Sequence, residues 1–252
     1  MAHNDNSATT LALFLLAGVA LTINIASSAP VGSQGAIAKG AEAGLSPGLV
    51  ATLLYDQTDS ASGSSAPDQD FEAAYDAYDS EGADDFEVTF PAGWDIDQVN
   101  TVGSGTGPVT DVTVRFYADN AGFPSAVPQP GCDFPDLSSF TGVDSLSIFL
   151  PTSCSLAPGT YWVSIQVEQD FVTADQHFWA NRTAQSFSES VWRNPGDGLG
   201  TGCTVWSRQR SCGVGGGVGP DFLFQILGAP ATLIFGDGFE TGTTTHWSLT
   251  RT

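Results

Sequence analysis

Apolar and polar residues alternate along at least five short runs of this sequence, and this pattern limits the fold more than any other feature. The run VTVRF, residues 112–116, places Val112, Val114 and Phe116 on one side and Thr113 and Arg115 on the other. A period of two residues is typical of β-strands with one buried and one wet face. The same pattern predicts these further inward-facing residues: Phe86, Val88, Phe90, Leu146, Ile148, Leu150, Tyr161, Val163, Ile165, Val167, Phe222, Phe224 and Ile226.

Turn-forming residues separate these runs. Pro91-Ala92-Gly93, residues 118–122 (ADNAG) and Ala157-Pro158-Gly159 each place a glycine where a positive φ is expected. Two sheets that each carry one apolar face must bury those faces against each other. The sequence therefore predicts an all-β fold, an antiparallel β-sandwich that forms a single domain over residues 49–229.

The N-terminal residues indicate export. Residues 11–25 (LALFLLAGVALTINI) have the length of the apolar part of a signal peptide and are too short to span a bilayer comfortably. We expect a signal peptide over residues 1–28, a linker over 29–48 and, after the domain, a tail element over 230–252. The first ten residues contain no Lys or Arg, which argues against a typical signal. The alternative is a buried N-terminal helix, but residues 11–25 lack polar positions at helical spacing.

The charge is strongly negative. The chain has 28 acidic and 7 basic residues, which gives a formal net charge of −21. Nucleic acids and anionic membranes are poor partners because both bind through clusters of Lys and Arg. The charge itself is typical of a protein that must stay soluble.

Four cysteines fit an oxidising compartment, in which an even number predicts disulfides. Three connectivities exist, and we favour the pairing between neighbours in sequence, Cys132 with Cys154 and Cys203 with Cys212. A zinc site is the weaker interpretation, because the sequence has no C-x-x-C pair and the histidines are far from ligand spacing.

The order of short motifs across residues 49–228 resembles a family of secreted bacterial β-sandwich domains that are mostly uncharacterised. The motifs are ADDFEV, PAGW, VTVRFYADNAG, LAPGTYWVSIQV, WANRT, VWRNPGDG and GPDFLFQILG. The resemblance implies a jelly-roll-like sandwich and an exported protein, and it transfers no catalytic residues. The tail IFGDGFETGTTTHWS, residues 234–248, is similar to a C-terminal GFE-x-G-x-T-x-x-W-S element of many exported proteins of Gram-negative bacteria. That similarity implies sorting or retention at the cell surface.

Residues 56–87 form an acidic segment with 11 carboxylates, and no Lys or Arg lies between Lys39 and Arg115. Ca²⁺ binds six to eight oxygens in irregular geometry. We therefore consider a calcium site built from Asp68, Asp70, Asp84 and Asp85. The sequence lacks a D-x-D-x-D-G loop, so the alternative is a solvated acidic loop.

Tryptophans on the wet face suggest a ligand platform. The alternation in TYWVSIQVEQ places Trp162 away from the core, and Trp179 and Trp192 lie among polar residues, with Arg182 close to Trp179 in sequence. Sugar rings stack on indole, so Trp162, Trp179, Trp192 and Arg182 are candidate ligand-binding residues. In the alternative, these indoles cap the sandwich edges or pack under the long loops, and Arg182 stacks on an indole or pairs with the acidic segment.

Catalytic signals are weak. His177 lies near Asp175, but the sequence has no G-x-S-x-G, H-E-x-x-H or P-loop motif. The favoured hypothesis is a secreted, noncatalytic binding module for a glycan or cell-surface polymer. The alternatives are a structural or adhesion protein of the envelope and, third, an extracellular hydrolase.

Overall fold

The structure of the chain, a computed structural model, describes residues 51–217 and 219–231. The predicted signal peptide, the linker and the tail from residue 232 lie outside the described residues. Strands dominate the described part and are almost all antiparallel, the exception being the short parallel pairing of β3 (Gln69–Asp70) with β12 (Gly159–Glu168). The all-β prediction is confirmed.

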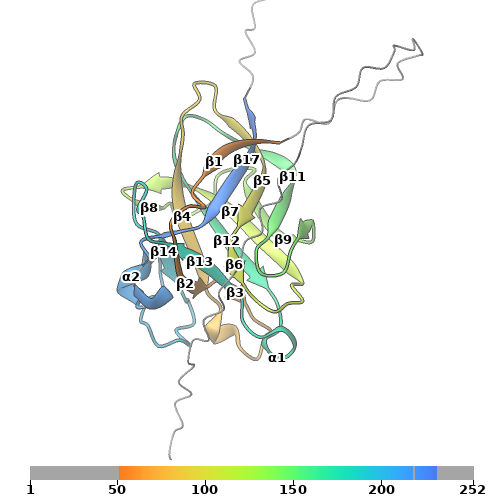
Figure 1. The fold of residues 1–252 in the computed structure, drawn as a ribbon, viewed down its shortest axis with the longest axis vertical. Coiled ribbons are helices and arrows are strands. Elements are labelled where there is room, and N and C mark those ends of the chain that lie inside the picture. The colour runs from red at the N-terminus through yellow and green to blue at the C-terminus, as the bar shows by residue number, and fades with distance from the viewer. Residues whose placement is uncertain (1–50, 218, 232–252) are drawn as a thin grey trace, which may run out of the picture. The chain divides into compact units, whose positions relative to one another are not determined.

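Three sheets form the domain (Figure 1). The five-stranded sheet has the order β1 (Thr52–Asp56), β17 (Phe224–Pro230), β5 (Trp94–Thr101), β11 (Ser147–Leu156) and β10 (Phe140–Thr141). The eight-stranded sheet has the order β15 (Ser207–Arg208), β14 (Val191–Arg193), β4 (Glu81–Val88), β12, β7 (Asp111–Asn120) and β8 (Phe123–Pro124), with β3 beside β12 and β9 (Asp133–Leu137) beside β7. The four-stranded sheet comprises β16 (Asp221–Phe222), β13 (Phe178–Arg182), β2 (Ala61–Pro67) and β6 (Gly103–Ser104).

Short helices lie in the connections. They are η1 (Asp76–Tyr78), α1 (Phe171–Ala174), α2 (Gln209–Cys212) and η2 (Gly215–Gly217). None of the helices in the described part of the chain is long and apolar enough to cross a membrane.

The long strands alternate between the two large sheets along the chain. β4, β7 and β12 belong to the eight-stranded sheet, whereas β5, β11 and β17 belong to the five-stranded sheet. Each time the chain passes from one large sheet to the other, the next strand places its apolar face against the opposite sheet. This is the arrangement of jelly-roll-like sandwiches.

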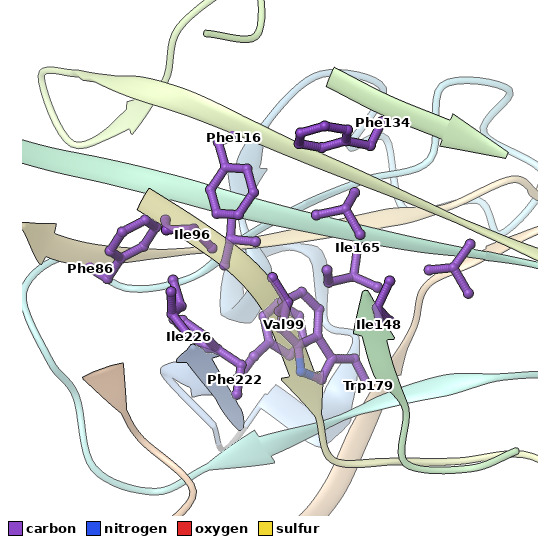
Figure 2. Packing of buried hydrophobic residues seen from close by; sticks show 14 of the residues in the cluster. Phe86, Ile96, Val99, Phe116, Phe134, Ile148, Ile165, Trp179, Phe222 and Ile226 are labelled. Atoms are coloured by element: carbon purple, nitrogen blue, oxygen red, sulfur yellow. The ribbon is translucent and has the colours of Figure 1, made fainter. Parts of the chain in front are cut away.

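The core lies between these sheets (Figure 2). Val112, Val114 and Phe116 of β7 are fully buried, as the alternation predicts, and Ile96 and Ile226 belong to the same core cluster. Burying such a side chain stabilises the fold by about 1.5–3 kcal/mol. Phe90 is an incorrect core prediction: it is 39% exposed because β4 ends at Val88.

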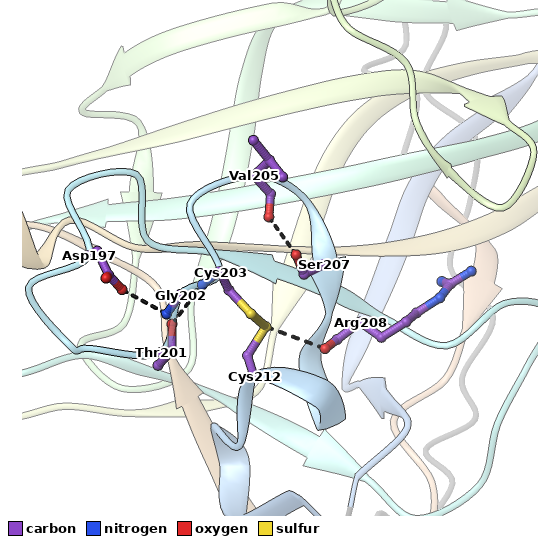
Figure 3. Close-up of a disulfide and its surroundings, with 8 residues drawn as sticks. All are labelled: Asp197, Thr201, Gly202, Cys203, Val205, Ser207, Arg208 and Cys212. Carbon is purple, nitrogen blue, oxygen red and sulfur yellow. Dashed lines mark hydrogen bonds between the residues drawn. A yellow bond between two sulfur atoms is a disulfide. The ribbon is translucent and has the colours of Figure 1, made fainter.

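Both predicted disulfides are present. Cys132 directly precedes β9 and Cys154 lies in β11, so this bond joins the two large sheets through the core. The Cys203–Cys212 disulfide closes a loop that ends in α2 (Figure 3).

Glycine is required at the turn after β4. Gly93 has a φ of +91°, and a Cβ at this position would lie 2.2 Å from the Leu156 carbonyl oxygen. Gly122 also has a positive φ, at +85°, as the sequence predicts.

Candidate functional site

The predicted tryptophan platform is wrong, because Trp162, Trp179 and Trp192 are all completely buried. Each indole N–H has found an acceptor within the domain. Trp179 donates to the Leu223 carbonyl and Trp192 to the Pro67 carbonyl. These side chains are therefore structural.

Trp162 does point away from the main core, as the alternation predicts, but that face is not wet. Trp162 packs in a second apolar cluster with Ala83, Tyr117 and Val191, and Trp206 packs against this cluster. The Trp162 Nε1 donates to Asp119 Oδ1 at 3.0 Å. The loop closed by the Cys203–Cys212 disulfide carries Trp206 and thus covers the face.

Arg182 is not free to bind a ligand. Its Nη2 lies 2.6 Å from Asp59 Oδ1, and its Nη1 donates to the Ser186 hydroxyl. Asp59 belongs to the acidic segment, so the structure agrees with the second alternative for this residue, pairing with that segment.

The four aspartates of the predicted calcium site do not come together. In the strand register, Asp70 of β3 lies opposite Glu168 of β12, whereas Asp84 of β4 lies opposite Val163 of β12. These two positions on β12 are five residues apart (168 − 163). Asp84 and Asp85 are consecutive in a strand and therefore point to opposite faces. Across the described residues, no group of three or more His, Cys, Asp or Glu could hold a metal ion. The prediction of a shared site is wrong.

Asp84 instead joins β4 to β16 in the interior. Its Oδ2 accepts hydrogen bonds from Gln57 Nε2 and the Phe222 N–H, both at 2.7 Å. Burial and the neighbouring Asp221 carboxylate raise the pKa of Asp84. Burial and Asp85 raise the pKa of Asp221 to about 7.

Asp68 binds His177. The His177 Nδ1 lies 2.7 Å from Asp68 Oδ1, and Nε2 lies 2.9 Å from the Asp144 carbonyl oxygen. Burial acts to lower the pKa of His177, but the Asp68 carboxylate outweighs it and raises that pKa. Both ring nitrogens face acceptors, so the imidazole has no free nitrogen to serve as a general base. This geometry does not support His177 as the base of a hydrolase.

A buried glutamate organises the covered face of the eight-stranded sheet. Glu81 accepts hydrogen bonds from the Ser164 hydroxyl, from Arg193 Nε at 2.8 Å and from Arg115 Nη1 at 3.4 Å. The Arg193 guanidinium stacks over Trp206, 4.1 Å from the ring centroid. Because its charges and acceptors are satisfied internally, this network holds the covering loop in place.

The outer face of the five-stranded sheet is different because it stays open. Strand register aligns Phe149 with Gln98, Gln98 with Leu227, and Leu227 with Leu53. Phe149 is 41% and Leu53 is 49% exposed, while Gln98 and Leu227 are half-buried. We call these four residues, three of which are apolar while Gln98 is polar, the apolar row; across four strands it spans about 14 Å.

A second row runs beside the apolar row. The same register aligns Asp56 with Gln225, Gln225 with Asn100, and Asn100 with Ser147. Gln98 Nε2 donates to Asn100 Oδ1 at 2.6 Å, and Asn100 Nδ2 donates to Gln225 Oε1 at 3.0 Å. We call Asn100 and Gln225 the amide row; hydrogen bonds fix its orientation.

Sequence reasoning overlooked this face, although one signal was available. The alternation that places Ile148 in the core places Phe149 on the opposite side of the same strand. An aromatic residue at an outward position is informative once its cross-strand neighbours are known, and those neighbours come from distant strands.

Comparisons of the chain with protein-family models, curated proteins and solved structures find no match.

Proposed function

We propose that the protein is an exported, noncatalytic binding module that holds an uncharged glycan on the outer face of its five-stranded sheet. The observation that carries this proposal is the apolar row, which aligns exposed Phe149 and Leu53 beside the amide row. Export is supported by the two disulfides, which form and persist in oxidising compartments.

The chemistry of the two rows matches a sugar polymer. The C–H face of a sugar ring packs on an aromatic ring or an aliphatic side chain. Side-chain amides both donate and accept hydrogen bonds, as sugar hydroxyls do. Gln98, Asn100 and Gln225 are already oriented by mutual hydrogen bonds, which lowers the entropy lost on binding.

Charge selects the class of glycan. A net charge of −21 repels anionic polymers at long range. Asp56, at the edge of the amide row, adds a negative charge locally. Neutral polysaccharides are therefore the expected ligands.

The test is retention of the full chain on a panel of neutral polysaccharides in affinity electrophoresis, followed by titration with soluble oligosaccharides. Phe149→Ala should weaken binding about 10-fold through loss of stacking. Phe90→Ala is the matched control, because Phe90 is 39% exposed and follows the end of β4 in the eight-stranded sheet. A Phe149→Ala variant that binds as well as the wild type, or a wild type that no neutral glycan retains, refutes the proposal.

A further inference from the structure

Four aromatic rings form a closed circuit at one end of β12. Phe71 contacts Tyr78 and Phe171, and Tyr75 contacts the same two rings. The centroid distances around the circuit are 5.5–6.4 Å and the interplanar angles 56–67°. We call these four residues the aromatic circuit.

The four side chains of the aromatic circuit differ in their exposure to solvent. Phe71 is 7% exposed, Tyr75 and Phe171 are half-buried, and Tyr78 is 39% exposed. A ligand could therefore reach the rings from the side of Tyr78 while Phe71 forms the base.

Backbone contacts hold the rings in position. The Phe71 N–H donates to Asp79 Oδ1 at 2.9 Å, and the Phe171 N–H donates to Glu72 Oε2 at 2.7 Å. The second bond ties α1 to the segment that carries Tyr75 and Tyr78. The rings are thus preorganised rather than dependent on a ligand for their arrangement.

The surroundings are strongly negative. Asp70, Glu72, Asp76 and Asp79 come from the same segment as three of the rings, and Asp170 directly precedes Phe171. Burial and the carboxylates Asp70 and Asp76 raise the pKa of Asp79 to about 6, although the hydrogen bond from the Phe71 N–H opposes this. The positive charge of Arg115 acts to lower the pKa of Asp70. Arg115 is, however, already paired with Glu81 and Asp133.

We propose that the aromatic circuit is a binding site for a small quaternary ammonium ion. Aromatic ring faces attract cations within about 6 Å of the centroid, and neighbouring rings of the circuit have their centroids 5.5–6.4 Å apart. A quaternary ammonium ion has no N–H group to satisfy and presents methyl groups to the rings. The carboxylates supply the complementary charge without the direct coordination that a metal ion requires.

The test is titration of the full chain with choline and with tetramethylammonium, followed by calorimetry and by NMR of the aromatic protons. The uncharged isostere 3,3-dimethylbutan-1-ol has the same shape as choline and serves as the ligand control. Both cations should bind and shift the tyrosine signals, whereas the isostere should bind at least about 10-fold more weakly. Absence of binding by both cations, or equal binding of the isostere, overturns the proposal.

Two substitutions at Tyr78 provide the protein controls, because this side chain is exposed enough for the variants to fold. Tyr78→Leu removes the ring and should weaken cation binding about 5- to 10-fold. Tyr78→Phe keeps the ring face and should bind within about 2-fold of the wild type. If Tyr78→Leu retains its thermal midpoint and still binds as the wild type does, the site lies elsewhere and the proposal is wrong. Phe149 contributes nothing to this site, so the result is independent of the glycan test.

Discussion

The outer face of the eight-stranded sheet carries Trp162 and Glu81 and is covered, whereas the outer face of the five-stranded sheet carries Phe149 and Leu53, which are exposed. Both faces have side chains at alternate positions of long antiparallel strands. The covered face meets Trp206 from the loop closed by Cys203–Cys212. Alternation therefore separates the two faces of a strand, but chain outside the sheet decides which of them contacts water.

The largest expected difference between the faces is in stability. Trp162→Ala should lower the free energy of unfolding by about 3–5 kcal/mol, because it leaves a cavity under the covering loop and removes the partner of Asp119. Phe149→Ala, on the open face, should lower it by no more than about 1 kcal/mol. Urea denaturation of both variants measures the difference. Equal losses would mean that the two faces are buried alike.

Removing the disulfide that closes the covering loop comes next. Cys203→Ser combined with Cys212→Ser should lower the free energy of unfolding by about 2–3 kcal/mol, because the bond closes a short loop. The loosened loop should also expose Trp206 and Trp162 to acrylamide, which quenches indole fluorescence. The control is the double variant Cys132→Ser with Cys154→Ser, which removes the disulfide in the core between the sheets. This variant should lose a similar amount of stability. If quenching is unchanged in the first variant, the disulfide does not maintain the cover.

The smallest effect is a difference in pH dependence. On the covered face, burial and the Asp119 carboxylate raise the pKa of Asp85 to about 6, although hydrogen bonds from Ser188 oppose this. On the open face, burial also acts to raise the pKa of Asp56, but hydrogen bonds from Thr58 outweigh it and lower that pKa. Because the folded-state pKa of Asp85 exceeds the unfolded value near 3.9, its stabilisation is complete below about pH 4 and is lost as the pH rises through about 6.

The thermal midpoint of the wild type should therefore rise as the pH falls from 7 to 5, and Asp79 and Asp221 act in the same direction. Asp85→Asn should flatten that rise by about 2–4 °C. Asp56→Asn should leave the slope between pH 7 and 5 unchanged, since the stabilisation from Asp56 is lost only at lower pH. Thermal unfolding followed by circular dichroism at several pH values checks both variants. An Asp85→Asn profile parallel to that of the wild type would contradict the assignment.

Much of the fold was predictable from local pattern. The spacing of Val112, Val114 and Phe116 was sufficient to identify a strand and its buried face, since side chains in a strand alternate whatever the strand packs on. The disulfide pairing that the sequence favoured among three possible ones is confirmed, and both bonds join cysteines that are close in sequence. The prediction that Phe90 is buried was wrong because the alternating pattern runs past the end of β4 into a turn.

The candidate sites were less predictable. Trp162 was placed on the correct face of its strand, but the sequence does not indicate that Trp206 would cover it. The apolar row combines side chains from β1, β17, β5 and β11, so Leu53 and Phe149 become neighbours on one surface only when the five-stranded sheet has assembled.

The sequence by itself determined that this chain forms strands with two unlike faces and, apart from Phe90, which residues lie on each face, and it favoured the disulfide pairing that the structure shows. These properties depend on the backbone period and on short loops, which are local. Only the tertiary structure decided that Asp68 binds His177, 109 positions away, that Trp162 is buried and that Phe149 is exposed. Such contacts depend on how distant segments cross the sheets, and burial is a property of the assembled surface rather than of any one strand.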